Sequence, residues 1–330
     1  MKRPPLPPDI EKIMESLSGD RYARIIMTAY ELGPAAKGEY LHWDKLRYKE
    51  PPEGLTHEEW WFAVKSMRMA IANKDLPLFD ECKVPFFFAI PDMVLEKLHK
   101  IDRDASGQLR ADSGMNELVS PHTRNSYLKS SLVEEAITSS QLEGASTTQA
   151  VAKEMLSQGR KPRDHSEQMI FNNYRAMEFV RDNIDKPISV ELIKELHRIV
   201  TDGTLDDPSA SGRYRMPDED IHVMDATHTQ VLHTPPKAEL LDERMRRLCR
   251  FANGGDDVPF VHPLIKAVIL HFMIGYDHPF VDGNGRTARA LFYWSVASQG
   301  YWLLEYVSIS RHIRKAPAQY AKAYLYTETD

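Results

Sequence analysis

The sequence predicts a mainly α-helical protein with one small β-hairpin and an N-terminal helical module. Apolar residues recur at helical spacing along most of the chain, and apolar–polar alternation is confined to residues 220–232. The chain has 330 residues, more than one hydrophobic core usually supports, so we expect a main domain and a smaller one. The polar, turn-rich segment 103–116 is the expected boundary. It separates an N-terminal module, residues 1–110, from a main domain, residues 111–330.

Composition narrows the class of protein. Apolar residues make up 42% of the chain and charged residues 27%, as in soluble globular proteins. The net charge of -6 provides no basic surface for nucleic acid, so no nucleic-acid partner is expected for these residues. Only two cysteines are present, and the sequence shows neither a secretory signal nor an apolar run of membrane-spanning length. We therefore expect a cytoplasmic protein without a membrane partner.

The N-terminal module contains one well-marked helix. A capping box beginning at Thr56 starts it, and the helix carries the pair Trp60 and Trp61. Residues 85–90, with the sequence PFFFAI, predict a short buried strand or extended segment, and Pro91 begins the next helix. We expect the tryptophans and the three phenylalanines to lie in the core.

The main domain is predicted to continue with amphipathic helices at residues 126–144, 166–184 and 189–203. Alternation at residues 220–232 then predicts a hairpin. A further helix is expected to begin at Thr234 and Pro235 and to end at the pair Gly254–Gly255.

Two consecutive helices follow, joined by a loop of unusual composition. Residues 262–277, HPLIKAVILHFMIGYD, are apolar on nearly all sides and predict a helix buried in the middle of the domain. His278 and Pro279 end it, and residues 286–300 form the next helix. The loop VDGNG, residues 281–285, therefore lies at the N-terminus of the second helix.

This loop has the residues of a polyphosphate site. Free backbone N–H groups, the helix dipole and two glycines favour a bound anion. Arg286 and Arg289 share one face of the first turn and can donate to phosphate oxygens. Asp282 offers a hard oxygen for magnesium, and His278 can accept a proton near neutral pH. Singly, each residue is more often structural; together they indicate phosphoryl or nucleotidyl transfer.

Residues 278–289, HPFVDGNGRTAR, resemble the signature of the Fic family. That signature is a histidine, Pro-Phe, one variable position, an acid, Gly-Asn-Gly-Arg, two further positions and an arginine. Every fixed position is met, and the similarity extends over roughly residues 120–325. One departure is Ala288, where many members have glycine, and we expect no loss of chemistry from it.

The resemblance implies a mostly helical Fic fold and a protein adenylyltransferase. A target hydroxyl attacks the α-phosphate of ATP, pyrophosphate leaves, and AMP stays on a Ser, Thr or Tyr side chain. The hairpin at 220–232 would bind the target, another protein or the chain itself, by strand pairing. The implied roles are a base at His278, a Mg²⁺ ligand at Asp282, phosphate-binding groups at Gly283, Asn284, Gly285 and Arg286, and a γ-phosphate ligand at Arg289.

A second segment, SSQLEG, resembles the inhibitory motif of the same family. Ser139, Glu143 and Gly144 occupy its fixed positions, at the end of the helix expected at residues 126–144. The chain thus resembles the class whose inhibitory helix precedes the Fic core. The expected resting contact is an ion pair between Glu143 and Arg289, which would exclude correctly placed ATP.

Other activities fit the same residues. A relative that removes AMP, or uses another nucleotide donor, has the same motif, whereas Gly285 argues against relatives that phosphorylate their target, which typically carry lysine there. Outside enzymes, the chain could be a non-catalytic nucleotide-sensing regulatory or toxin–antitoxin module. The intact His278 counts against this, because a sensor does not need the base. The sequence specifies neither the target nor a role for residues 1–110. Association into a homo-oligomer and continuation past residue 330 also stay open.

Overall fold

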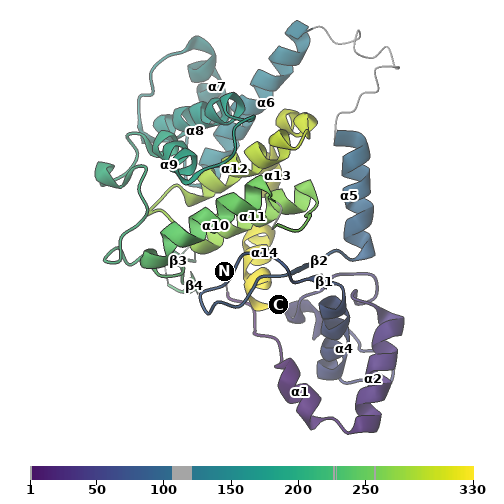
Figure 1. The fold of residues 1–330 in the computed structure, drawn as a ribbon. Coiled ribbons are helices and arrows are strands. Elements are labelled where there is room, and N and C mark those ends of the chain that lie inside the picture. Colours follow the sequence, from purple (N-terminus) through teal and green to yellow (C-terminus); the bar gives the residue numbers. More distant parts are fainter. Residues whose placement is uncertain (1, 106–120, 226, 228, 256–257) are drawn as a thin grey trace.

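The computed structural model describes residues 2–105, 121–225, 227, 229–255 and 258–330. Over these residues it contains fourteen α-helices and two antiparallel pairs of short strands, which confirms the predicted mainly helical class (Figure 1). None of the helices in these ranges is both long enough and apolar enough to cross a membrane. The predicted boundary near residue 110 lies outside the described residues.

The N-terminal part contains α1 Ile10–Ser16, α2 Gly19–Leu32, α3 Trp43–Leu46, α4 His57–Ala70, β1 Ala72–Asn73, β2 Phe88–Ala89 and α5 Asp92–Ala105. The main part begins with α6 Pro121–Leu142, α7 Gln149–Gln158, α8 His165–Asp182 and α9 Val190–Thr201. The strands β3 Val223–Met224 and β4 Val231–His233 follow. The remaining helices are α10 Leu241–Asn253, α11 Pro263–Asp277, α12 Asn284–Ser298, α13 Ile309–Lys315 and α14 Pro317–Thr329. Short 3₁₀ turns lie at η2 Pro208–Ala210, η3 Ala238–Leu240 and η4 Trp302–Tyr306.

Helix α4 begins as the sequence predicts. Thr56 accepts from the Glu59 N–H, and the Glu59 side chain accepts from the Thr56 N–H, so both bonds of the capping box form. Trp60 and Trp61 are fully buried, which confirms their place in the core. The module formed by α1 to α4 thus has a small core of its own.

Residues 85–90 form an extended segment, the second of the two alternatives expected, and not a buried strand. In β2, Phe88 and Ala89 pair with Asn73 and Ala72, Pro85 forms an isolated bridge with Phe79, and Phe87 is 39% exposed. The sheet of β1 and β2 is too small to be covered on both faces. The side chains of Phe87, Phe88 and Ala89 line a cavity, and among the described residues no further helix or strand packs over them there.

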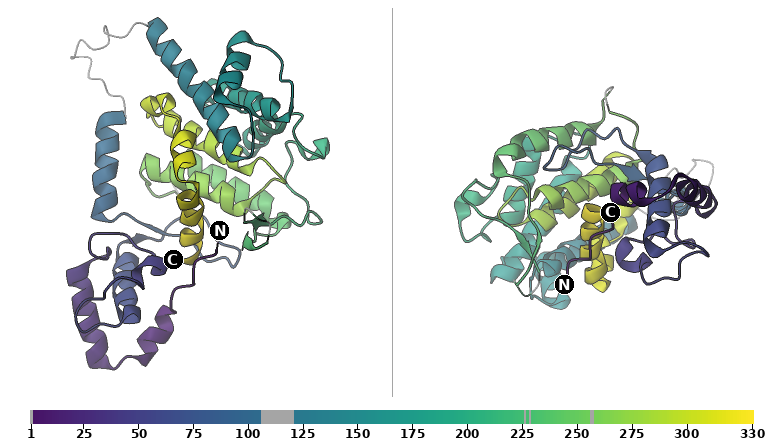
Figure 2. Two further views of the ribbon diagram at one scale, coloured as in Figure 1. Left: turned by 180° about the vertical axis from the view of Figure 1, so that it is seen from behind. Right: turned by 90° about the horizontal axis from the view of Figure 1, so that it is seen from below.

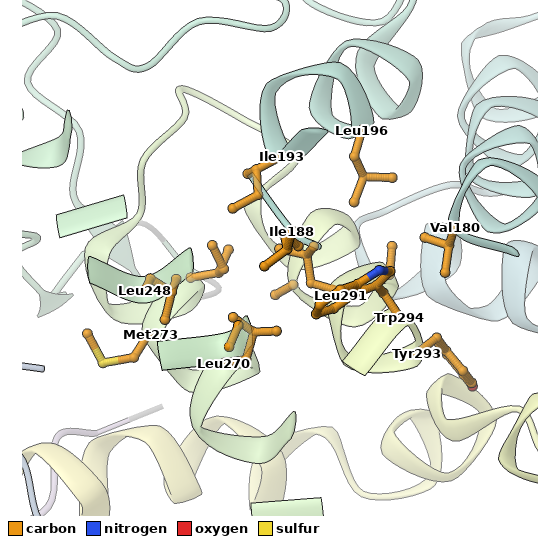
Figure 3. Close-up of a cluster of buried hydrophobic side chains, with 14 of the residues drawn as sticks. Val180, Ile188, Ile193, Leu196, Leu248, Leu270, Met273, Leu291, Tyr293 and Trp294 are labelled. Carbon is orange, nitrogen blue, oxygen red and sulfur yellow. The ribbon is translucent and has the colours of Figure 1, made fainter. Parts of the chain in front are cut away.

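Helices α11 and α12 lie at the centre of the main part, with α8, α9 and α10 packed around them (Figure 1). Figure 3 shows the side chains that meet there: Ile193 and Leu196 of α9, Leu248 of α10, Leu270 and Met273 of α11, and Leu291 and Trp294 of α12. This arrangement confirms the predicted place of the apolar helix, α11, in the middle of the domain, although Val268 on the side that lines a cavity is 55% exposed. The packed helices support the loop between α11 and α12.

The predicted hairpin is present, with Val223 opposite His233 and an irregular register beside it. The helix expected from Thr234 begins later, at Leu241, after a 3₁₀ turn. The reason is local: Pro235 precedes Pro236, and a residue before proline is disfavoured in the helical region. The expected inhibitory helix is observed as α6, which extends further toward the N-terminus and ends at Leu142.

Helix α14 joins the two parts of the chain, running from the main part to the N-terminal helices (Figure 1, Figure 2). Buried Arg68 of α4 donates to the carboxylate of Asp330, and His42 stacks on Tyr326 with ring centroids 4.4 Å apart. Helix α5, which falls inside the module predicted at residues 1–110, instead packs Leu98 against the main part. The contacts of the N-terminal module with the main part therefore centre on α14.

Leu291→Ala tests the central position of α12. Leu291 is 0% exposed, so its truncation should lower the free energy of unfolding by about 2–5 kcal/mol. Leu95→Ala on α5 is the matched control, because Leu95 is 56% exposed and its loss should cost about 0.5 kcal/mol or less. Urea titrations measure both, and equal losses would contradict the assignment.

Candidate active site

His278 ends α11 in a left-handed backbone conformation, with φ 43° and ψ 58°. This conformation is strained for a residue other than glycine, and hydrogen bonds of His278 to its neighbours stabilise it. The Nδ1–H of His278 donates to the Gly275 carbonyl at 3.4 Å, and Arg215 Nε donates to the His278 carbonyl at 2.9 Å. With Nδ1 carrying the hydrogen, the lone pair is on Nε2.

The imidazole of His278 is neutral near pH 7. Its pKa is lowered to about 4, mainly by burial and also by the charges of His233 and Arg215, while the hydrogen bond to the Gly275 carbonyl acts in the opposite direction. A neutral ring with a fixed tautomer can accept a proton on Nε2, which is what a general base requires.

The loop after His278 is closed by Asn284. Its side chain accepts from the Phe280 N–H at 3.0 Å and donates to the Phe280 carbonyl at 2.8 Å. The amide expected to bind phosphate is thus used inside the loop, which leaves the backbone N–H groups of the first turn for an anion. Gly283 has φ 80°, and a Cβ there would lie 2.8 Å from the Thr201 methyl group, so only glycine fits.

Asp282 and Arg286 form an ion pair at 3.3 Å beside the loop. The Asp282 side chain is 60% exposed, whereas that of Arg286 is fully buried and also donates to the Val200 carbonyl at 3.0 Å. Arg286, expected beside the phosphates, therefore braces Asp282 and the loop in this structure. The Asp282 carboxylate remains accessible to a cation.

Arg289 is buried and bonded to the end of α6. Its Nε donates to Ser139 Oγ at 2.7 Å, and a terminal nitrogen donates to Glu143 at 2.6 Å. The expected pair between Glu143 and Arg289 is thus confirmed as a contact. Burial works to lower the pKa of Arg289, but Glu143, Tyr320 and Glu135 together outweigh burial, so the pKa is raised.

The carboxylate of Glu143 also covers the first turn of α12. A Cβ placed on Gly285 would overlap one Glu143 carboxylate oxygen, closer than any real contact. Glu143 therefore lies where the helix dipole and the free N–H groups favour an anion. Glycine at 285 permits this close approach, and a larger residue there would displace the carboxylate of Glu143. Gly144 follows with φ 95°, a conformation that suits the turn ending α6.

His197 is a site residue that sequence reasoning missed. It stacks on Phe280 with ring centroids 3.7 Å apart, donates through Nε2 to the Asp282 carbonyl at 2.9 Å, and accepts the Gly212 N–H at 3.0 Å. Burial lowers its pKa to about 4, so the ring is neutral. A histidine on the apolar face of a predicted helix was the available signal, but its partners come from distant segments.

An apolar cavity of about 450 Å³ lies beside Arg289. Its wall includes Phe272 of α11 and Tyr320 and Tyr324 of α14, and Tyr320 bonds His271 at 2.7 Å. A volume of this size is typical of small-molecule sites.

The site suits a magnesium ion that arrives with phosphates. No group of three or more His, Cys, Asp or Glu residues able to hold a metal occurs among the described residues. Asp282 is a single exposed carboxylate, and Mg²⁺ is commonly held by one or two carboxylates together with substrate phosphates. The donor set therefore fits a substrate-borne ion.

Comparisons with known proteins agree with this geometry. Residues 187–296 match the Fic/DOC family. The chain is 28% identical over 203 residues to the protein adenylyltransferase Fic of Nematostella vectensis, covering 61% of this chain and 42% of the relative. It is 26% identical over 235 residues to the protein adenylyltransferase fic-1 of Caenorhabditis elegans, covering 69% and 42%. The chain thus spans less than half the length of these curated relatives.

Solved structures share the fold. A fragment of C. elegans Fic-1 has a TM-score of 0.51 and 15% identity, covering 96% of this chain and 90% of that one. A Fic family protein from Desulfovibrio desulfuricans has a TM-score of 0.52 and 20% identity, covering 70% and 65%. The helical architecture with α11, its loop and α12 at the centre is that of a Fic domain. Residues 187–296 of this chain accordingly form a Fic domain.

Stability should decrease as the pH falls from about 6.5 to about 4. Burial lowers the pKa values of His197, His271 and His278 to about 4, whereas histidines of an unfolded chain titrate near pH 6.5. Over this interval the unfolded state takes up protons that the folded state does not, so acid favours unfolding. Thermal unfolding at pH 7, 6 and 5 measures the effect, which should be shallower in His197→Gln. An unfolding midpoint that stays level across this range would contradict the prediction.

Proposed function

We propose that this protein is an autoinhibited protein adenylyltransferase, which transfers AMP from ATP to a Ser, Thr or Tyr hydroxyl of a protein. One observation carries the proposal. A neutral His278, fixed by its bond to Gly275, lies beside the N-terminus of α12, and Glu143 of the same chain covers that N-terminus. Relatives that are named protein adenylyltransferases support the reaction type. Two free cysteines, Cys82 and Cys249, are compatible with a cytoplasmic setting.

In the proposed reaction the target hydroxyl oxygen attacks the α-phosphorus of ATP. The bond from that phosphorus to the α,β-bridging oxygen breaks, and pyrophosphate leaves with its electron pair. The hydroxyl proton passes to Nε2 of His278, whose Nδ1 stays bonded to the Gly275 carbonyl. Positioning and charge stabilisation supply most of the rate, as in phosphoryl transfer generally.

The nucleotide is bound by groups already in place. The first turn of α12, at Gly283 to Gly285, offers N–H groups to the phosphates, and Arg289 offers a guanidinium to the γ-phosphate. Mg²⁺ would neutralise phosphate charge beside Asp282, which Arg286 orients. The apolar cavity beside Arg289 is large enough for the adenosine.

The target is proposed to bind along the hairpin of β3 and β4. Over the residues that the structure describes, this sheet has two strands, so its edges can accept an extended segment by main-chain hydrogen bonds. Val231 is 41% exposed and can contact a target side chain. The target is another protein or a second copy of the chain.

A second candidate keeps the site but changes the net reaction. Glu143 lies against Gly285, close to where an α-phosphate would bind, and a carboxylate there can orient water. The protein would then remove AMP from a modified target. Transfer from another nucleotide donor is a further alternative, since the loop contacts phosphates and not the base. The fixed, neutral His278 favours any of these reactions over a non-catalytic nucleotide sensor or toxin–antitoxin module.

His278→Ala is expected to abolish transfer and retain ATP binding. General-base catalysis raises the rate by roughly 10²–10⁴-fold. The imidazole is proposed to act as the base, whereas the first turn of α12 and Arg289 are proposed to bind ATP, so the substitution should affect rate and not affinity. The variant is best made together with Glu143→Gly, so that there is activity to lose. Labelled ATP with Mg²⁺ measures transfer, and calorimetry measures binding. Loss of both binding and folding would make His278 a structural residue.

Glu143→Gly is expected to raise labelling of the chain or of added target by on the order of tenfold or more, because it removes both the competitor for Arg289 and a charge that repels the triphosphate. Glu143→Gln, which keeps the size of the side chain, should give an intermediate gain. Glu134→Gln on the same helix is the control, since Glu134 pairs with Arg311 and not with the site. If Glu143→Gly gives no gain with ATP, GTP, UTP or CTP, the inhibitory role is wrong.

A further inference from the structure

Glu135 of α6 is a buried carboxylate with an unusually complete set of partners. It is 2% exposed and accepts from Tyr293 Oη at 3.0 Å, Ser308 Oγ at 2.9 Å, the Ser310 N–H at 3.0 Å and the Ser310 hydroxyl. All four of these donors are neutral groups, contributed by α12 and by the start of α13. A buried carboxylate is costly unless its oxygens are bonded, so this cluster is specific for one position of α6.

The same face of α6 carries the inhibitory residues. Glu135, Ser139 and Glu143 are spaced four residues apart, so they lie in one row along the helix. Glu135 contacts Tyr293, whereas Ser139 and Glu143 contact Arg289, one turn earlier on α12. Later residues of α6 thus contact earlier residues of α12, so the two helices run antiparallel where these rows meet.

These contacts between α6 and α12 can form together in only one position of α6 along its axis. Sliding α6 by one turn, about 5.4 Å, would remove Glu135 from its donors and Glu143 from Arg289 together. Thr138 adds a contact in the same register, because its hydroxyl lies 3.1 Å from that of Ser308. The contacts at Glu135 and those at Glu143 are thus coupled through a rigid helix.

We propose that Glu135 is the positioning residue of the inhibitory helix. Its clamp on Tyr293, Ser308 and Ser310 fixes α6 so that Glu143 reaches Arg289, and the strength of the clamp sets the strength of inhibition. The proposal rests on the proposed inhibitory role of Glu143. It makes α13 part of the regulation, since any partner that displaces Ser308 and Ser310 releases Glu143 from Arg289.

Glu135→Gln tests this, because it preserves size but replaces one acceptor oxygen with an NH₂ group facing other donors. ATP with Mg²⁺ is the probe, and calorimetry in a His278→Ala background keeps chemistry out of the measurement. Loss of one hydrogen bond to a charged group is worth about tenfold, so ATP affinity should rise by on the order of tenfold. Adding Glu135→Gln to Glu143→Gly should change ATP affinity little. Glu134→Gln, one residue away and paired with Arg311, should leave affinity unchanged.

Hydrogen exchange separates this role from general destabilisation. In Glu135→Gln the amides of residues 128–142 should exchange faster while those of α9 do not. Unchanged ATP affinity, or an equal gain with and without Glu143, would overturn the proposal. If the variant does not fold, Ser308→Ala removes the hydroxyl that donates to Glu135 at 2.9 Å and should give a smaller gain in the same direction. If Glu143→Gly binds ATP but transfers nothing, the proposed function fails while the ATP-affinity test of Glu135 still stands.

Discussion

The buried guanidinium of Arg289 is the constraint on which the site depends. Arginine stays charged in proteins, and a buried charge left without a partner costs about 3–5 kcal/mol. Arg289 therefore needs an anion whatever the state of the site, and in this structure Glu143 supplies it. A triphosphate meets the same need. Under the proposed function, exchange of one anion for the other would keep the buried charge paired, so inhibition and nucleotide binding would use a single position.

The loop that is proposed to receive the nucleotide is held independently of Glu143. His197 of α9 bonds the Asp282 carbonyl, Arg215 bonds the His278 carbonyl, and Asn284 closes the turn on Phe280. None of these bonds involves Glu143. The backbone that carries the base and the anion cradle is thus preorganised, and displacement of Glu143 need not reshape it. Under the proposed function, this separation would allow the inhibitory carboxylate to be removed without loss of the catalytic arrangement.

The sequence predicts the site where its residues are contiguous and fails where they are not. Residues 278–289 could be interpreted because twelve neighbours carry the whole pattern, and the contact of Glu143 with Arg289 followed from a second compact motif. His197 and Glu135 could not be assigned, because their bonds join segments that only packing brings together. Phe87 was misplaced for the same reason: hydrophobicity predicts burial, but only tertiary structure shows which layer is missing.

Helix α14 links the N-terminal module, which the sequence left without a role, to the site. One face is held by the module, through Arg68 on Asp330 and His42 on Tyr326. The other face contributes Tyr320 to the cavity beside Arg289. Because a packed helix moves as a unit, the module cannot shift without moving this aromatic wall. Residues far from the loop in sequence thereby take part in shaping the space that a nucleotide would enter.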